Sequence, residues 1–171
     1  LVVLDPELIN SRVKDAGLPY QRLIVVFAVL HAVIRRIAHW LAHDALEFQL
    51  VFLEPTKSQP AFSEFVEEQI ELLSMLFGEQ IEHNLLSIRR DTWPHVVDLA
   101  ESVSRRTLTH VLLVSSRNFP EYPQRVFLTR LNAARPQPAL SLDEEEPLSV
   151  DEDTLLGIWN QTLLHLIRAW L

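Results

Sequence analysis

The residues best suited to chemistry in this sequence are arginines and hydroxyl side chains that follow predicted β-strands. They are Thr56, Arg89, Arg90, Ser115, Ser116 and Arg117. Guanidinium groups bind carboxylates and phosphates through paired hydrogen bonds, and hydroxyl groups can add further ones. Ligands of open α/β sheets bind just outside the carboxyl ends of the strands. These residues therefore predict an anion or small-ligand site at that edge, unless the loops simply collect polar side chains.

A pair of histidines has a spacing that suits metal binding. His39 and His43 are four residues apart on a predicted helix, so both rings can lie on one face. A metalloprotease helix has a glutamate directly after the first histidine, where this sequence has Trp40. The alternative is a partly exposed helix end, and we predict no metal or other cofactor.

Other catalytic chemistry has no local signature. The chain has no cysteine, which excludes disulfides, thiolate metal sites and cysteine nucleophiles. It contains three glycines and no glycine-serine-glycine elbow of the kind that presents a nucleophilic serine. We therefore predict no catalytic residues, and the sequence favours a protein that is not an enzyme.

The negative charge of the chain is concentrated in one tract. The formal net charge is −8, and seven negative charges without a basic residue fall within residues 143–153, so the remainder carries a net charge of −1. A nearly neutral body gives little support to sequence-independent binding of nucleic acid. We also find no apolar run as long as the roughly 18 residues of a membrane span, and we expect a cytoplasmic protein.

Four apolar runs separated by amphipathic patterns are the elements that must position these side chains. The runs are Leu23–Phe27, Leu46–Leu53, Ile81–Ile88 and His110–Ser115. Alternating strands and helices at this spacing predict an α/β fold, a three-layer doubly wound and mostly parallel sheet with helices on both faces. The first run is rich in β-branched residues and predicts a strand followed by a helix, although one long buried helix over Tyr20–Ala45 is the alternative.

The flanking segments are less regular. Leu1–Leu4 predicts an edge strand or the end of a further segment, and it is closed by Asp5-Pro6. Arg125–Ala134 fits a helix or a strand. Because the loop before it is too short for a crossover to a parallel strand, we predict a helix there, followed by an edge strand at Ala139–Leu142.

Three regions follow from these patterns: an α/β domain over residues 1–142 with its core at residues 22–116, an acidic linker over 143–150, and a C-terminal amphipathic helix over Asp151–Leu171. Ser149 and Glu152 have the spacing of a capping box at the start of that helix. The helix carries too much apolar surface to remain in water, so it packs on its own sheet, on a second copy, or on a protein partner.

The order of elements between Arg22 and Leu142 resembles the universal stress protein superfamily, a group of HUP-type α/β domains. The resemblance implies a five-stranded parallel sheet with helices on both faces. Nucleotide-binding members of that family have an aspartate at the end of the first strand and a glycine-rich phosphate loop after the fourth. This sequence has Phe27-Ala28 at the first position and a segment without glycine, Ser115–Gln124, at the second. The resemblance therefore implies no nucleotide binding in the family's manner.

These observations favour a non-catalytic regulatory or protein-interaction domain that contacts a protein partner or a second copy through its terminal helix. Such a domain also suits the cytosolic part of a larger membrane transport protein. One alternative is a small-ligand or nucleotide-binding domain with a non-standard phosphate loop. A second alternative is a hydrolase or transferase whose catalytic residues are dispersed along the chain.

Overall fold

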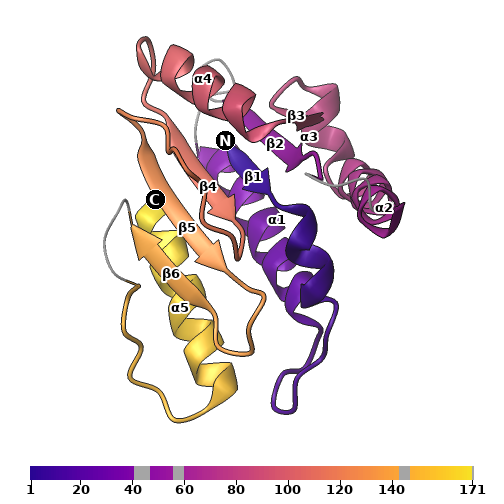
Figure 1. Ribbon diagram of the computed structural model, residues 1–171, viewed down its shortest axis with the longest axis vertical. Coiled ribbons are helices and arrows are strands. Elements are labelled where there is room, and N and C mark those ends of the chain that lie inside the picture. Colours follow the sequence, from indigo (N-terminus) through magenta and orange to yellow (C-terminus); the bar gives the residue numbers. More distant parts are fainter. Residues whose placement is uncertain (41–46, 56–59, 143–146, 171) are drawn as a thin grey trace.

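A six-stranded sheet forms the centre of the molecule (Figure 1). The computed structural model describes residues 1–40, 47–55, 60–142 and 147–170. The strands are β1 (Val2–Leu4), β2 (Phe48–Leu53), β3 (Leu86–Asp91), β4 (His110–Val114), β5 (Phe127–Asn132) and β6 (Ala139–Leu142). Their order across the sheet is β3-β2-β1-β4-β5-β6, and only β6 runs antiparallel to its neighbour.

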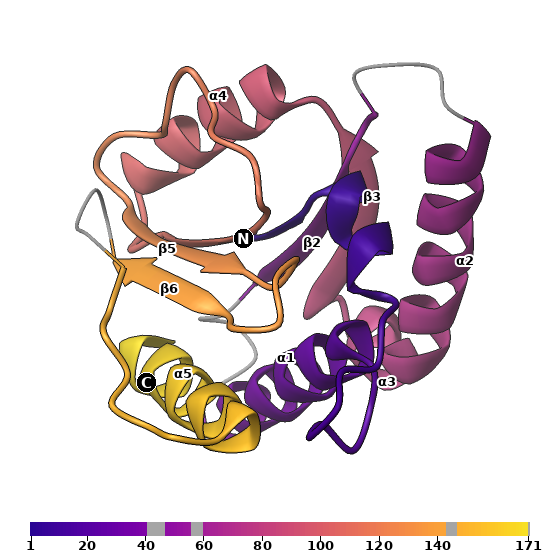
Figure 2. The ribbon, with the colours of Figure 1, turned by 60° about the horizontal axis from the view of Figure 1, so that its bottom comes forward.

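Helices cover both faces of this sheet, which confirms the predicted fold class. They are α1 (Arg22–Trp40), α2 (Pro60–Leu76), α3 (Gly78–Glu82), α4 (Trp93–Ser104) and α5 (Leu155–Trp170), together with a 3-10 helix, η1 (Pro6–Ser11). Figure 2 shows α4 on one face, with α1 and α5 on the other. Because side chains alternate along a strand, Val2 and Leu4 face the core under α1, whereas Val3 faces α4.

The short first strand is central, so its prediction as an edge strand is wrong. Val3 is paired with Val51 of β2 on one side and with Leu113 of β4 on the other. All three residues of β1 are fully buried. A strand of three residues is too short to show a period in the sequence, and only its neighbours on both sides reveal its place.

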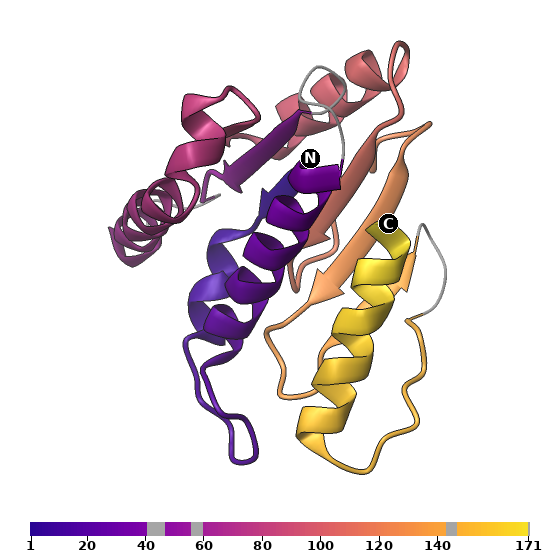
Figure 3. The same cartoon turned by 180° about the vertical axis from the view of Figure 1, so that it is seen from behind.

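The predicted first strand, Leu23–Phe27, is instead part of α1. Its side chains are buried at helical spacing, as at Leu23, Val26 and Leu30, while Ile24 is half exposed. The alternative of one long helix is therefore correct over Arg22–Trp40, while residues 41–45 lie outside the described residues. By length and composition α1 is also apolar enough to cross a membrane. Here its apolar stripe packs on the sheet. Figure 3 shows α1 and α5 on this same face, seen from behind.

Two further segments differ from their predictions. Part of Ile81–Ile88 is helical: α3 ends at Glu82, and β3 begins only at Leu86, after a turn in which Asn84 has φ of 57°. Asparagine adopts this left-handed conformation more readily than most residues. Arg125–Ala134 contains the strand β5 rather than a helix, and β5 is parallel to β4. The connection over residues 115–126 reaches the start of β5 without a helix. The predicted edge strand β6 is confirmed.

The C-terminal helix α5 packs on its own sheet. Trp159 is 1% exposed, and its indole N–H donates a hydrogen bond to the carbonyl oxygen of Pro136 at 2.8 Å. The helix begins at Leu155, so the predicted capping box is wrong; the Thr154 hydroxyl accepts from the N–H of Gly157 at 3.1 Å instead. Of the predicted linker, residues 143–146 lie outside the described residues.

Candidate functional site

The carboxyl ends of β1 and β4 lie side by side at the centre of the sheet. The chain order reverses here, because β2 and β3 lie on one side of β1 while β4, β5 and β6 lie on the other. In open α/β sheets such a switch point is the usual place for a ligand. The residues that follow the two strands are Asp5 and Glu7 after β1, and Ser115, Ser116 and Arg117 after β4.

Asp5 is the centre of this group, and it is fully buried. Its Oδ2 atom accepts hydrogen bonds from the Ser115 hydroxyl at 2.5 Å and from the Nε atom of Arg117 at 2.6 Å. Its Oδ1 atom accepts from the backbone N–H of Glu7 at 2.9 Å, so Asp5 also caps η1. Both oxygens of the carboxylate are therefore bonded. Burying a carboxylate is favourable only with such partners.

The guanidinium of Arg117 is held in place by its own loop. The backbone N–H of Arg117 donates to the Ser115 hydroxyl at 3.0 Å, and its guanidinium lies over the Phe119 ring at 5.2 Å. Phe119 in turn packs on Trp93 of α4, with ring centroids 4.3 Å apart. Aromatic packing thus fixes the loop that carries the charge partner of Asp5.

The loop between β4 and β5, β5 itself and the first turn of η1 complete the group of side chains around Asp5. Arg130 of β5 donates to the side chain of Asn118 at 3.0 Å and lies over the Tyr122 ring at 5.0 Å. On the other side, the Ser116 hydroxyl donates to the Glu7 carboxylate at 2.7 Å. Segments that are far apart in the sequence therefore meet around one ion pair, whose carboxylate is buried and whose guanidinium is partly exposed.

Side chains of the protein itself occupy the position that a ligand would take at this switch point. Carboxylate and hydroxyl oxygens, as in Asp5, Glu7, Ser115 and Ser116, are the ligand atoms that hard cations such as Mg²⁺ and Ca²⁺ take. The Arg117 guanidinium already supplies a positive charge against Asp5, at hydrogen-bonding distance. As arranged, these residues do not fit a cation, and the anion-binding arginine predicted from the sequence is committed to an internal carboxylate.

The structure brings together only part of the predicted ligand edge. Ser115, Ser116 and Arg117 converge as expected. Arg89 and Arg90 lie within β3, which β2 separates from β1. Arg90 approaches Glu67 at 3.2 Å and Arg89 approaches Asp91 at 3.4 Å. Their inclusion in one site with Ser115 is therefore wrong, because β3 is the far edge of the sheet. Thr56 lies outside the described residues.

The histidine pair cannot be assembled from the described part of the chain. His39 is exposed near the end of α1, and His43 lies outside the described residues. Among the residues that the structure describes, no three metal-binding side chains come together.

The family model of vWA domains found in the FtsH ternary systems matches residues 1–170. This chain belongs to that family. No curated protein and no solved structure matches it significantly. The resemblance to universal stress proteins is therefore wrong, because the matched family is that of a vWA domain. The element order on which the resemblance depended assigned Leu23–Phe27 to a strand, whereas the structure has the helix α1 there.

The central residue of this vWA domain's switch point, Asp5, was missed by sequence reasoning. The signal was present, because Asp5 directly follows the apolar run Leu1–Leu4. An aspartate at the end of the first strand was sought after Phe27, since the first strand was placed at the wrong segment. Once β1 is known to be the central strand, the acidic residue that ends it becomes the first candidate.

Proposed function

We propose that this vWA domain is a non-catalytic protein-interaction domain that binds another protein of an FtsH ternary system, and that it acts in the cytoplasm. The family description supports an assembly of more than one protein. The observation that carries the proposal is the closed switch point. The position where a doubly wound sheet usually holds a ligand is taken by the ion pair between Asp5 and Arg117.

The contact surface does not require the buried face of α5. That face is covered by the sheet through Trp159, Leu163 and Leu166. The outer face still carries Leu156 and Leu164, which are about half exposed. Binding through the predicted contact helix, or formation of a homodimer, would therefore use this outer face and leave the fold intact.

We expect the chain to form a stable complex with another protein of the same FtsH ternary system. The two proteins would be co-purified and analysed by size-exclusion chromatography with light scattering. A complex whose mass equals that of the assembled partners supports the proposal. If the folded chain elutes alone after mixing with each of the other components of the system, the interaction role is refuted.

A thermal-shift series tests the same proposal against small-ligand binding. Saturating ligand at 100 times its dissociation constant stabilises a protein by about 2.7 kcal/mol. With Arg117 in place, we expect no shift from nucleotides, phosphate or Mg²⁺ at millimolar concentration. A clear rise in melting temperature with any of them would favour the ligand-binding alternative and contradict a closed switch point.

A further inference from the structure

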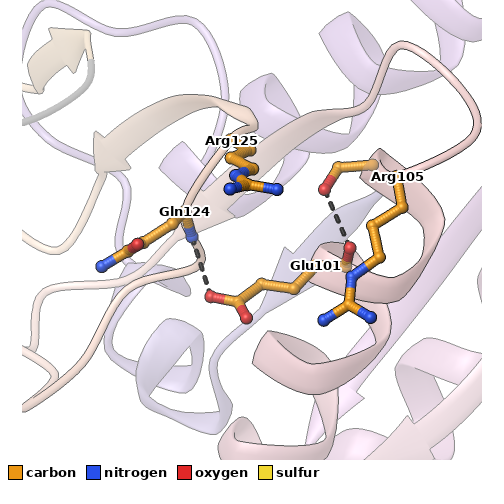
Figure 4. A pocket seen from close by; sticks show the side chains of 5 residues that line it. Glu101, Arg105, Gln124 and Arg125 are labelled. Carbon is orange, nitrogen blue, oxygen red and sulfur yellow. Dashed lines mark hydrogen bonds between the residues drawn. The ribbon is translucent and has the colours of Figure 1, made fainter.

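A polar hollow lies near the amino ends of the strands, at the opposite edge of the sheet from the switch point. It is formed where α4 ends and where the chain enters β5, and its volume is about 230 Å³. Its lining residues are Glu101, Ser104, Arg105, Gln124 and Arg125. Figure 4 shows Arg105 and Arg125 reaching this hollow from two separate segments of the chain.

The two arginines make the lining of the hollow net positive, because Glu101 is the one acidic residue among its lining residues. Neither Arg105 nor Arg125 forms an ion pair within the described part of the chain, and both are exposed. Glu101 contributes one negative charge to the same hollow, where its carboxylate accepts from the backbone N–H of Gln124 at 3.0 Å (Figure 4). In a chain of net charge −8, this is a local site of positive charge.

The backbone at Arg125 is held in an unfavourable conformation. Its φ is 61°, in the left-handed region that residues other than glycine and asparagine rarely adopt. Such conformations persist where the surrounding structure holds them, and they are concentrated at functional sites. A tight turn alone would favour glycine at this position. The chain has Arg125 instead, and its guanidinium reaches the hollow.

Two exposed apolar residues follow the two arginines along the chain. Leu108 is 79% exposed and Phe127 is 53% exposed. The backbone N–H of Phe127 donates to the carbonyl oxygen of Thr109 at 3.0 Å, which brings the two segments together. The Phe127 ring also stacks on that of His110, with centroids 4.8 Å apart. Arginine and aromatic side chains are the residue types that dominate the energy of protein interfaces.

We infer that this hollow binds an acidic segment of a protein partner, with a carboxylate between Arg105 and Arg125. The inference deepens the proposed function and depends on it, because it names the surface and the chemistry of the partner. Two guanidinium groups beside the one carboxylate of Glu101 leave charge complementary to one further carboxylate. An extended nucleic acid would need a continuous basic surface, and the net charge of the chain opposes it.

The test measures binding of a fluorescein-labelled peptide with a repeating Glu-Asp-Leu sequence by fluorescence anisotropy. We expect the double variant Arg105→Glu/Arg125→Glu to bind about tenfold more weakly, or worse, because it reverses both charges. Binding to the unmodified chain should weaken as salt is raised. The control variant Arg35→Glu/Arg135→Glu makes the same change of charge at two exposed arginines elsewhere, and it should bind like the unmodified chain.

A second variant separates loss of binding from loss of folding. Arg125→Gly removes the guanidinium and suits the φ of 61° at this position, so the variant should melt at the same or a higher temperature. It should nevertheless bind the peptide more weakly. Peptide binding as tight as that of the unmodified chain in Arg125→Gly and in the double variant would overturn the inference.

The remaining outcomes distinguish this inference from the proposed function. If the complex with a system partner forms equally well with the Arg105→Glu/Arg125→Glu chain, the surface is wrong while the interaction role stands. If no system partner binds the unmodified chain, the proposed function fails first. Equal loss of peptide binding in the control variant, or displacement of the peptide by poly-uridylate but not by excess unlabelled peptide, also overturns the inference.

Discussion

Replacing Arg117 with methionine is expected to lower the free energy of unfolding by about 3 kcal/mol, because it leaves the buried Asp5 carboxylate without its positive partner. Asp5 is 0% exposed and Arg117 is 24% exposed at the side chain. The Ser115 hydroxyl and the Glu7 N–H still donate to Asp5, which keeps the loss near the lower end of the range for a broken buried pair. Urea denaturation of the two proteins measures the difference.

The double variant Asp5→Asn/Arg117→Met tests whether the two residues are energetically coupled. Once the carboxylate is neutral, removal of the guanidinium no longer leaves a buried charge unpaired, so the two changes should cost less together than their sum. Arg135→Met, at an exposed position, is the matched control and should change stability by less than about 0.5 kcal/mol. Additive effects in the double variant would show that Asp5 and Arg117 are not coupled.

Replacing Trp159 with alanine is expected to cost about 3–5 kcal/mol, the range for removal of a large aromatic side chain from a core. Trp159 joins α5 to the sheet and donates to the carbonyl oxygen of Pro136 at 2.8 Å. Trp159→Phe keeps most of the ring and loses this hydrogen bond, so it should cost distinctly less. Chemical denaturation followed by circular dichroism measures both variants.

A tryptophan on the surface provides the control for this second prediction. Trp40 is 53% exposed near the end of α1, where the Arg36 guanidinium lies over its ring at 4.3 Å. Trp40→Ala should cost less than about 1 kcal/mol, the value of an exposed contact of this kind. If Trp159→Ala proves as mild as Trp40→Ala, then α5 is not part of the folded core, and a partner rather than the sheet covers its apolar face.

Local patterns were sufficient wherever a segment had one unambiguous period. The helix α2 lies in one of the amphipathic patterns between the predicted strands, and its apolar residues at helical spacing include Phe65 and Leu73, which are buried. The strands β2 and β4 were recognised by their apolar runs. The run Leu23–Phe27 was misassigned because a continuous apolar segment fits a buried strand and a buried helix equally well. At β5 the pattern fitted a helix or a strand, and the helix was chosen because the preceding loop is short. The structure has a strand there, in which Leu128 and Leu131 are buried.

Of the candidate site, only the residues that follow β4 were predicted from the sequence. Ser115, Ser116 and Arg117 follow a strand that the sequence shows clearly, so their place at the carboxyl edge could be predicted. Their partner was not, because β1 contains only three residues and carries no period. The hydrogen bond from Ser115 to Asp5 spans 110 residues, a separation at which no local pattern gives information.

By itself, the sequence determined the class of fold and excluded cysteine chemistry, because alternation of apolar periods and amino-acid composition are local properties that need no knowledge of neighbours. Tertiary structure decided which strand is central and which charge Arg117 meets. Both depend on how distant segments bury one another: Val2–Leu4 becomes central because β2 and β4 cover its two edges, and Asp5 is then carried into the interior. A buried carboxylate requires a partner, and Arg117 is that partner.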